Sequence, residues 1–243
     1  MNTNITSRAG NFTSSSIYRL MGSKKAMDTY IEEKQFERGL QRQLSKEVST
    51  RPISWGHYCE ARVLNVLLDT SYKNTHDKRF IHPVINNWTG VPDFLRPEHK
   101  IVGDVKSFEL KMFCKVLKNY ALGLDNFKVE HDDIYWQLVS NLILTESDKA
   151  ELILYVPYKK ELSAIKDSIE EDTDKKFQWI KYAEDDEMVY LIESGEYKNL
   201  NILSFTIPES DKLALTNRVI MANKELLNKK TQYDTTSNSK LMW

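Results

Sequence analysis

The 243-residue sequence is poor in cysteine: it has only Cys59 and Cys114, which do not form a CxxC pair. Structural zinc sites and disulfide frameworks need more cysteines at closer spacing, so neither is supported. The low cysteine content is typical of a protein from a reducing compartment. No two histidines have metal-ligand spacing such as HxxxH, which leaves no histidine-based zinc site to consider.

Long apolar runs are also missing. The sequence contains no stretch of 18 or more apolar residues, whereas a transmembrane helix needs about 20. Residues 1–16 are polar and lack the apolar core of a signal peptide. We therefore expect a cytoplasmic protein without a membrane anchor.

An excess of charge of either sign is absent as well, because the formal net charge is −1. Nucleic-acid-binding proteins usually carry a basic surface, so this balance argues against that class. The charge is nevertheless uneven. Residues 1–62 hold 10 Lys/Arg and 6 Asp/Glu, a net of +4, and residues 146–211 hold 8 and 17, a net of −9. A local basic surface can bind DNA within a neutral protein, so this class stays open.

The hydrophobic pattern predicts helices and strands in alternation. Helical spacing predicts helices from residue 17, within 24–50, from the N-cap Ser54 to 67, over 132–145 and from 208 to about 228. Strands are predicted at residues 80–86, 89–95, 100–107, 151–156 and 200–205. The order indicates an α/β fold (α+β-like) with a mixed central sheet flanked by helices. We expect one domain over residues 1–230 and a polar, flexible tail over residues 231–243.

Two carboxylates and a lysine stand in a predicted hairpin. Asp93 ends the first strand, and Asp104 follows 11 positions later (104 − 93) in the second. Paired strands bring such positions side by side, and Asp104 and Lys106 share one strand face because they are two residues apart. Adjacent carboxylates repel unless a divalent cation lies between them, and oxygen ligands suit Mg²⁺ or Mn²⁺. A lysine beside them could neutralise a phosphate and orient or deprotonate a water. The plainer interpretation is a turn with a solvated lysine.

Several motifs resemble one nuclease family. Pro92-Asp93 and Asp104-Val105-Lys106 fit the PD-(D/E)xK signature, and four flanking blocks resemble the YqaJ-type viral recombinase nucleases, the lambda exonuclease-like family. The four blocks are Arg8-Ala9-Gly10-Asn11-Phe12-Thr13-Ser14-Ser15, Trp55-Gly56-His57-Tyr58-Cys59-Glu60, Tyr135-Trp136-Gln137 and Tyr155-Val156-Pro157. They follow the family's order over about residues 8–158, with a catalytic core at about residues 50–160.

The resemblance implies a restriction-endonuclease-like core and a Mg²⁺-dependent exodeoxyribonuclease. Such an enzyme would digest linear duplex DNA from 5′ to 3′ in recombination, in a bacterial cell or a virus-infected host cell. The family also implies a ring-shaped homo-oligomer and a single-strand annealing protein as partner. Two alternatives stay open: an endonuclease or junction resolvase with the same core, and an inactive fold that only binds DNA or protein.

The resemblance also assigns roles to residues. It implies four metal ligands, with the last one acting directly or through water: Asp93, Asp104, the Val105 carbonyl and Glu60. Lys106 would position the nucleophilic water, and Gln137 would support that lysine or the scissile phosphate. Arg8 and Ser15 would hold a 5′-terminal phosphate. The sequence departs from the pattern at Phe94, where many members have glycine, and in having the shorter aspartate at 104.

Overall fold

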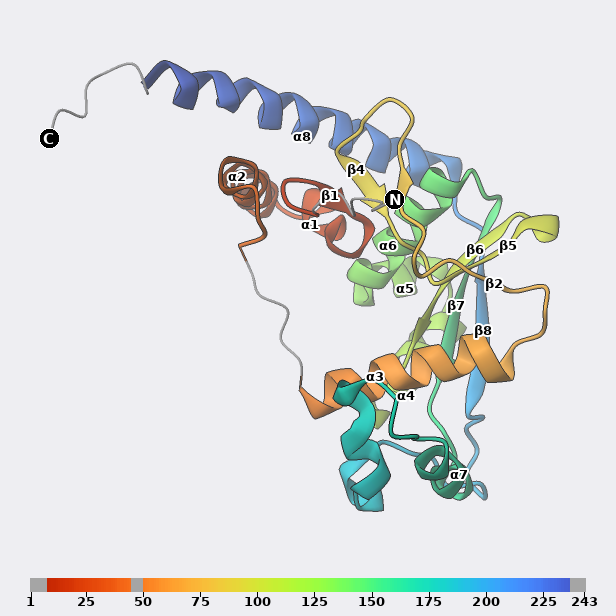
Figure 1. The fold of residues 1–243 in the computed structure, drawn as a ribbon. Helices are drawn as coiled ribbons and strands as arrows, with labels where there is room; N and C mark the ends of the chain where they lie inside the picture. The colour runs from red at the N-terminus through yellow and green to blue at the C-terminus, as the bar shows by residue number, and fades with distance from the viewer. Residues whose placement is uncertain (1–7, 45–49, 237–243) are drawn as a thin grey trace, which may run out of the picture.

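The centre of the protein is a five-stranded mixed sheet (Figure 1). The computed structural model describes residues 8–44 and 50–236. In spatial order its strands are β2 (Lys73–Asn74), β5 (Phe94–Arg96), β6 (Ile101–Lys106), β7 (Lys149–Tyr155) and β8 (Leu200–Phe205). β6 and β7 run parallel and the other neighbours are antiparallel. β6 is buried along Ile101–Val105, and Asp104 is a charged residue within this buried stretch. The predicted α/β fold is therefore confirmed.

The hairpin that carries the two aspartates differs in one respect from the prediction. β5 pairs with β6 in the register Phe94 to Gly103. Asp93 does not end a strand: it directly precedes β5, and its N–H donates to the carbonyl of Gly103 at 3.1 Å. The predicted strand over 89–95 is split because Pro92 has no N–H for a strand ladder.

The first half of that split strand belongs to a second, three-stranded sheet. Its order is β1 (Phe12–Thr13), β4 (Trp88–Gly90) and β3 (Phe80–Ile81), and β1 runs parallel to β4. The prediction of a strand over 80–86 is too long, because Pro83 follows β3 closely and interrupts strand pairing. β1 and β2 were not predicted. Their two-residue length gives no periodic signal.

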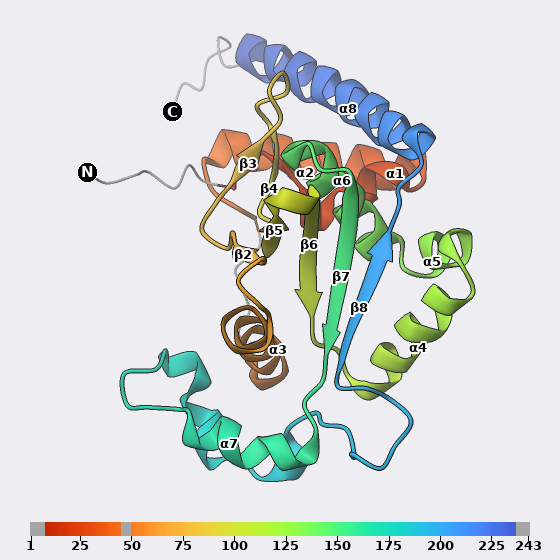
Figure 2. The ribbon, with the colours of Figure 1, turned by 90° about the vertical axis from the view of Figure 1, so that its right-hand side faces the viewer.

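Helices cover both faces of the central sheet (Figures 1 and 2). One hydrophobic core includes buried side chains of α1 (Tyr18–Met21), α2 (Lys24–Leu40), α4 (Leu110–Ala121), α5 (Leu124–Glu130), α6 (Asp132–Thr145) and α8 (Glu209–Thr236). The other lies under α3 (Arg51–Arg62) and α7 (Leu162–Asp167). One π-helix is at Val63–Leu67, and 3₁₀ helices are at Ser14–Ser16, Pro97–His99, Lys159–Glu161, Lys175–Tyr182 and Asp185–Glu187. Within the described ranges, no helix is long and apolar enough to cross a membrane.

The helix predictions were partly right. α6 and β8 have the predicted bounds. Ser54 is not an N-cap, because α3 begins three residues earlier, with Thr50 at the cap and Pro52 in the first turn, where no N–H is needed. α2 ends at Leu40, short of the predicted range, and part of that range (45–49) lies outside the described residues. α8 continues to Thr236, past the predicted end at about residue 228, and residues 237–243 lie outside the described residues. The flexible tail over residues 231–243 stays a prediction.

Candidate active site

The two aspartates meet at the end of the β5–β6 hairpin. The N–H of Val105 donates to Oδ2 of Asp93 at 2.7 Å, which fixes the Asp93 carboxylate across from β6. Asp104 precedes Val105 on that strand and is 2% exposed. Lys106 is half-buried and lies on the same face as Asp104, two residues on. The structure therefore brings these three predicted residues together.

Glu60 reaches the same place from α3. The helix passes the end of β6, because a Cβ at Gly56 would lie 3.7 Å from the Ser107 carbonyl. Burial raises the pKa of Glu60 to about 7, and the negative charges of Asp93 and Asp104 add to this, while Lys106 opposes it. The charges of Asp93, Asp104 and Lys106 all act on Glu60, so Glu60 lies near the other three in one charge cluster.

The cluster also sets the charge states of Asp104 and Lys106. Burial raises the pKa of Asp104 to about 7, with the nearby Asp93 acting in the same direction against Lys106. Burial alone would lower the pKa of Lys106, but Asp104, Asp93 and Glu60 together raise it above its usual value. Lys106 is thus held as a cation among three carboxyl groups.

The arrangement fits a divalent cation. Asp104 Oδ1 is buried without a hydrogen-bond partner within the described residues, and an unpaired carboxylate oxygen beside a second carboxylate is a hard-oxygen donor set. No group of three or more His, Cys, Asp or Glu side chains is placed to hold a metal ion in residues 8–44 and 50–236. Asp93 and Asp104 are then the carboxylates that the hairpin could offer to a cation, and main-chain oxygen and water would have to complete the shell, as is common for Mg²⁺.

α6 closes the site from the other face of the sheet. The amide Nδ2 of Asn141 donates to Asp104 Oδ2 at 3.0 Å, and both side chains are buried. Gln137 lies four residues earlier on the same helix face, and Asp133 four residues before that contributes to the raised pKa of Lys106. Gln137 is therefore on the face that borders the cluster, in a half-buried position.

Arg8 and Ser15 line a separate cavity of about 510 Å³ between the N-terminal segment and α2. Two ion pairs form part of its wall: Arg19 with Glu33 at 2.5 Å and Lys34 with Glu37 at 2.9 Å. Glu37 also accepts the N–H of Gly10 at 2.9 Å, so α2 fixes the course of the segment that contains Arg8. The structure brings Arg8 and Ser15 together, as the shared motif implied.

This cavity is joined to the carboxylate site through α6. The hydroxyl groups of Ser14 and Ser140 are 2.8 Å apart, and Trp88 donates its indole N–H to Ser140 at 2.8 Å. Ser14 precedes Ser15 at the cavity, and Ser140 precedes Asn141 at Asp104. Two adjacent residues of α6 thus contact Asp104 and the residue next to the cavity-lining Ser15.

Comparison with known proteins gives a match in structure only. No family model and no curated protein matches the sequence. The alkaline exonuclease LHK-Exo from Laribacter hongkongensis aligns over 95% of this chain and 94% of its own, with a TM-score of 0.64 and 13% identity. LHK-Exo in complex with dAMP aligns over the same shares with the same TM-score and 14% identity. A phage-related exonuclease from Haemophilus somnus 129PT aligns over 92% and 96%, with a TM-score of 0.54 and 11% identity.

The chain has the fold of these exonucleases. The likeness agrees with the lambda exonuclease-like resemblance read from the sequence and with a PD-(D/E)xK core. At identities of 11–14% it establishes the fold.

Sequence reasoning missed Asn141 as a site residue. Its signal was weak but present: α6 is buried along most of its length, and an amide on such a helix needs a polar partner. The partner is Asp104, 37 positions earlier (141 − 104), and no local pattern reveals a contact at that separation.

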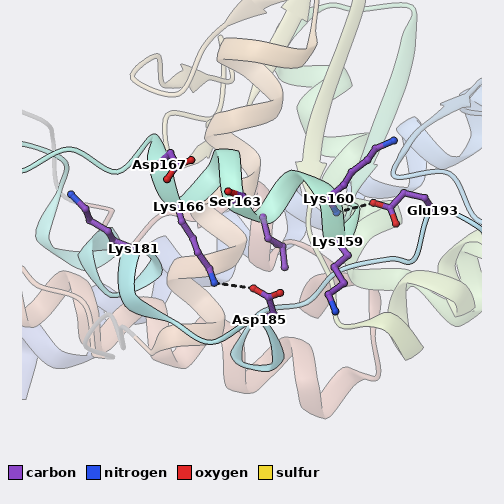
Figure 3. A pocket seen from close by; sticks show the side chains of 9 residues that line it. Lys159, Lys160, Ser163, Lys166, Asp167, Lys181, Asp185 and Glu193 are labelled. Carbon is purple, nitrogen blue, oxygen red and sulfur yellow. Dashed lines mark hydrogen bonds and ion pairs between the residues drawn. The ribbon is translucent and has the colours of Figure 1, made fainter.

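A second cavity, of about 600 Å³, lies at α7 within the exonuclease fold (Figure 3). Its lysines are interleaved with carboxylates: Lys166 pairs with Asp185 at 2.8 Å, and the N–H of Lys160 donates to Glu193 at 2.7 Å. None of the site residues predicted from the sequence lines it. We therefore place the candidate chemistry at the β5–β6 hairpin.

Proposed function

We propose that this chain is a metal-dependent exodeoxyribonuclease that hydrolyses phosphodiester bonds of DNA. The observation that carries the proposal is the convergence of Asp93, Asp104, Lys106 and Glu60 at one hairpin end, in a fold shared with known exonucleases. Crowded carboxylates repel phosphate, so a site that only bound DNA would gain nothing from them. One neighbour, LHK-Exo, has been crystallised with dAMP, a deoxynucleoside monophosphate, and this supports DNA as the substrate class.

The residues divide the chemistry between them. Asp93, Asp104 and the Val105 carbonyl would hold Mg²⁺, or Mn²⁺ as a substitute, with Glu60 contacting it through water. The bound cation would supply charge neutralisation at the phosphate and a more acidic water. Lys106 is held protonated by the carboxylates, so its ammonium group donates hydrogen bonds that orient the attacking water and the phosphate. Gln137, on the bordering face of α6, would contact Lys106 or the scissile phosphate.

The direction of digestion is the finer part of the proposal. Arg8 and Ser15 would bind a terminal 5′-phosphate in the N-terminal cavity, because a guanidinium and a hydroxyl are suitable donors to phosphate oxygens. Such binding would favour 5′-to-3′ digestion of linear duplex DNA. A role in viral or mobile-element recombination rests on the family resemblance. A homo-oligomeric ring and a single-strand annealing partner rest on the family resemblance alone and stay predictions.

A cleavage assay on end-labelled linear duplexes, with and without a 5′-phosphate, tests the proposal. Lys106→Ala should lower the Mg²⁺-dependent rate by about 10²–10³-fold, the usual cost of removing one preorganised hydrogen-bond donor, and Asp93→Ala should abolish it. Lys100→Ala is the matched control, since Lys100 is an exposed lysine (its side chain is 67% exposed) directly before β6. The proposal is wrong if cleavage survives in Asp93→Ala.

Two further substrates separate the alternatives. An exonuclease spares closed circular DNA, so cleavage of circles or of branched junctions would favour an endonuclease or junction resolvase with the same core. Arg8→Ala should remove the preference for a 5′-phosphate while leaving the metal requirement unchanged. Calorimetry in which neither Mg²⁺ nor Mn²⁺ binds would favour the DNA- or protein-binding alternative.

A further inference from the structure

The side-chain amide of Asn141 is placed against one oxygen of Asp104 and leaves the other free. Its Nδ2 donates to Asp104 Oδ2 at 3.0 Å, and the two side chains are 0% and 2% exposed. Asp104 Oδ1 is buried without a hydrogen-bond partner in the described part of the chain. The two oxygens of this carboxylate therefore have different surroundings.

The amide is an unfavourable choice for packing alone. Asn141 Oδ1 is buried and, within the described residues, accepts no hydrogen bond, and an unpaired buried carbonyl destabilises the folded state. Its neighbours along α6, Leu138, Leu142 and Leu144, are buried apolar side chains. A leucine at 141 would have the same branching and no unpaired carbonyl. What it would lack is the donor to Asp104.

The surroundings leave the amide little freedom to move. A Cβ at Gly90 would lie 2.8 Å from Asn141 Oδ1 and 2.3 Å from Ser14 Oγ, so the backbone of β4 packs directly on this side chain. The preceding residue, Ser140, is held by the hydroxyl of Ser14 and the indole of Trp88, each at 2.8 Å. A donor held this firmly can define the position of the carboxylate that it contacts.

We propose that Asn141 is a positioning residue for Asp104. Its amide holds Oδ2, selects one side-chain rotamer of the aspartate and directs Oδ1 toward the cation. An aspartate reaches less far than a glutamate, so its usefulness as a ligand depends more strongly on a fixed orientation. This inference rests on the proposed metal-dependent function and names the residue that tunes the metal affinity of that site.

The test measures Mn²⁺ binding to the DNA-free full-length protein by calorimetry and by electron paramagnetic resonance. Asn141→Leu and Asn141→Ser remove the donor with and without retained volume, and each should weaken Mn²⁺ binding by about 10–100-fold, as loss of a partner of a metal ligand usually does. Asn119→Leu is the matched control: Asn119 is also a buried helical amide, it contacts His131 at 3.1 Å, and its loss should leave Mn²⁺ affinity unchanged.

A cleavage titration with Mg²⁺ provides the second readout. In Asn141→Ser the Mg²⁺ concentration for half-maximal rate should rise by a similar factor, while the rate at saturating Mg²⁺ recovers to within about threefold of the unsubstituted protein, because the ligands themselves are intact. A loss of rate that no Mg²⁺ concentration restores, with half-saturation unchanged, would overturn the positioning role.

The outcomes separate this inference from the proposed function. If the unsubstituted protein binds no Mn²⁺, the proposed function fails. If it binds Mn²⁺ and a cooperatively folded Asn141→Ser binds it within twofold as tightly, the inference fails and the proposed function stands. Should Asn141→Leu not fold, the serine variant decides, since it creates space rather than a clash.

Discussion

Neutralising Glu60 should stabilise the metal-free protein at neutral and alkaline pH. Its carboxyl group is half-buried beside Asp93 and Asp104, and its pKa is raised from 4.5 to about 7. Glu60→Gln keeps the shape of the side chain and removes the charge. The substitution should therefore increase the free energy of unfolding while it impairs Mg²⁺-dependent cleavage.

The size of the effect follows from the pKa difference between the folded and the unfolded chain. One pKa unit corresponds to about 1.4 kcal/mol, so a rise from 4.5 to about 7 amounts to about 3 kcal/mol at most, and less where solvent reaches the group. The folded state holds this proton more tightly than the unfolded state. The stability that Glu60 contributes is therefore complete below pH 4.5 and is lost as the pH rises through about 7.

The assay is denaturant unfolding in EDTA at several pH values from 5 to 8. The variant should exceed the unsubstituted protein by a small amount at about pH 5 and by up to about 3 kcal/mol at about pH 8. Glu98→Gln, at an exposed glutamate in the turn before β6, should follow the unsubstituted protein throughout. Equal stability of Glu60→Gln and the unsubstituted protein at pH 8, or a less stable variant, would refute the reasoning that these carboxylates share one site.

Three further stability predictions use the same unfolding assay. Gly90→Ala should destabilise by about 1–3 kcal/mol through overpacking, because its Cβ would lie 2.3 Å from the Ser14 hydroxyl, whereas Gly39→Ala in α2 meets nothing within 4 Å and should stabilise by up to about 1 kcal/mol. Asp211→Ala should lower the free energy of unfolding by about 2–5 kcal/mol, because the Tyr135 hydroxyl and the Lys128 ammonium group lose their acceptor. The same variant should bind Mn²⁺ as tightly as the unsubstituted protein. Lys34→Met should cost about 3–5 kcal/mol because the buried Glu37 carboxylate loses its cation and keeps only backbone N–H donors. Lys100→Met should cost less than about 1 kcal/mol, because the ion pair of Lys100 is exposed.

The sequence was sufficient for those elements whose signal is local. α6 and β8 were predicted with their bounds because periodic apolar residues and flanking turn residues mark both ends. The hairpin was predicted because a turn separates two apolar runs. Asp93, Asp104 and Lys106 could be placed together for the same reason, since the register of one hairpin determines their proximity.

Features that depend on tertiary contacts could not be predicted in this way. The hydrogen bond from Asn141 to Asp104 joins a helix to a strand, and neither segment alone indicates the other. The pairing of β4 with the N-terminal segment rather than with β6 joins residues far apart in the sequence, and no local pattern indicates it. The helix that holds Glu60 was predicted, but its start was placed at Ser54, because a serine before an apolar run is a frequent N-cap and the competing first turn contains a proline.

The parallel pairing of β1 with β4 has a consequence for how the chain folds. Phe12 pairs with Trp88, 76 positions later (88 − 12), while the β5–β6 hairpin closes over only a few residues. Short loops close far more readily than long ones, so the hairpin can bring the two aspartates together before β1 pairs with β4. The amide of Asn141 emerges later still. A growing chain therefore carries its carboxylates before it has the groups that orient them, and it should have no nuclease activity until α6 has packed against the sheet.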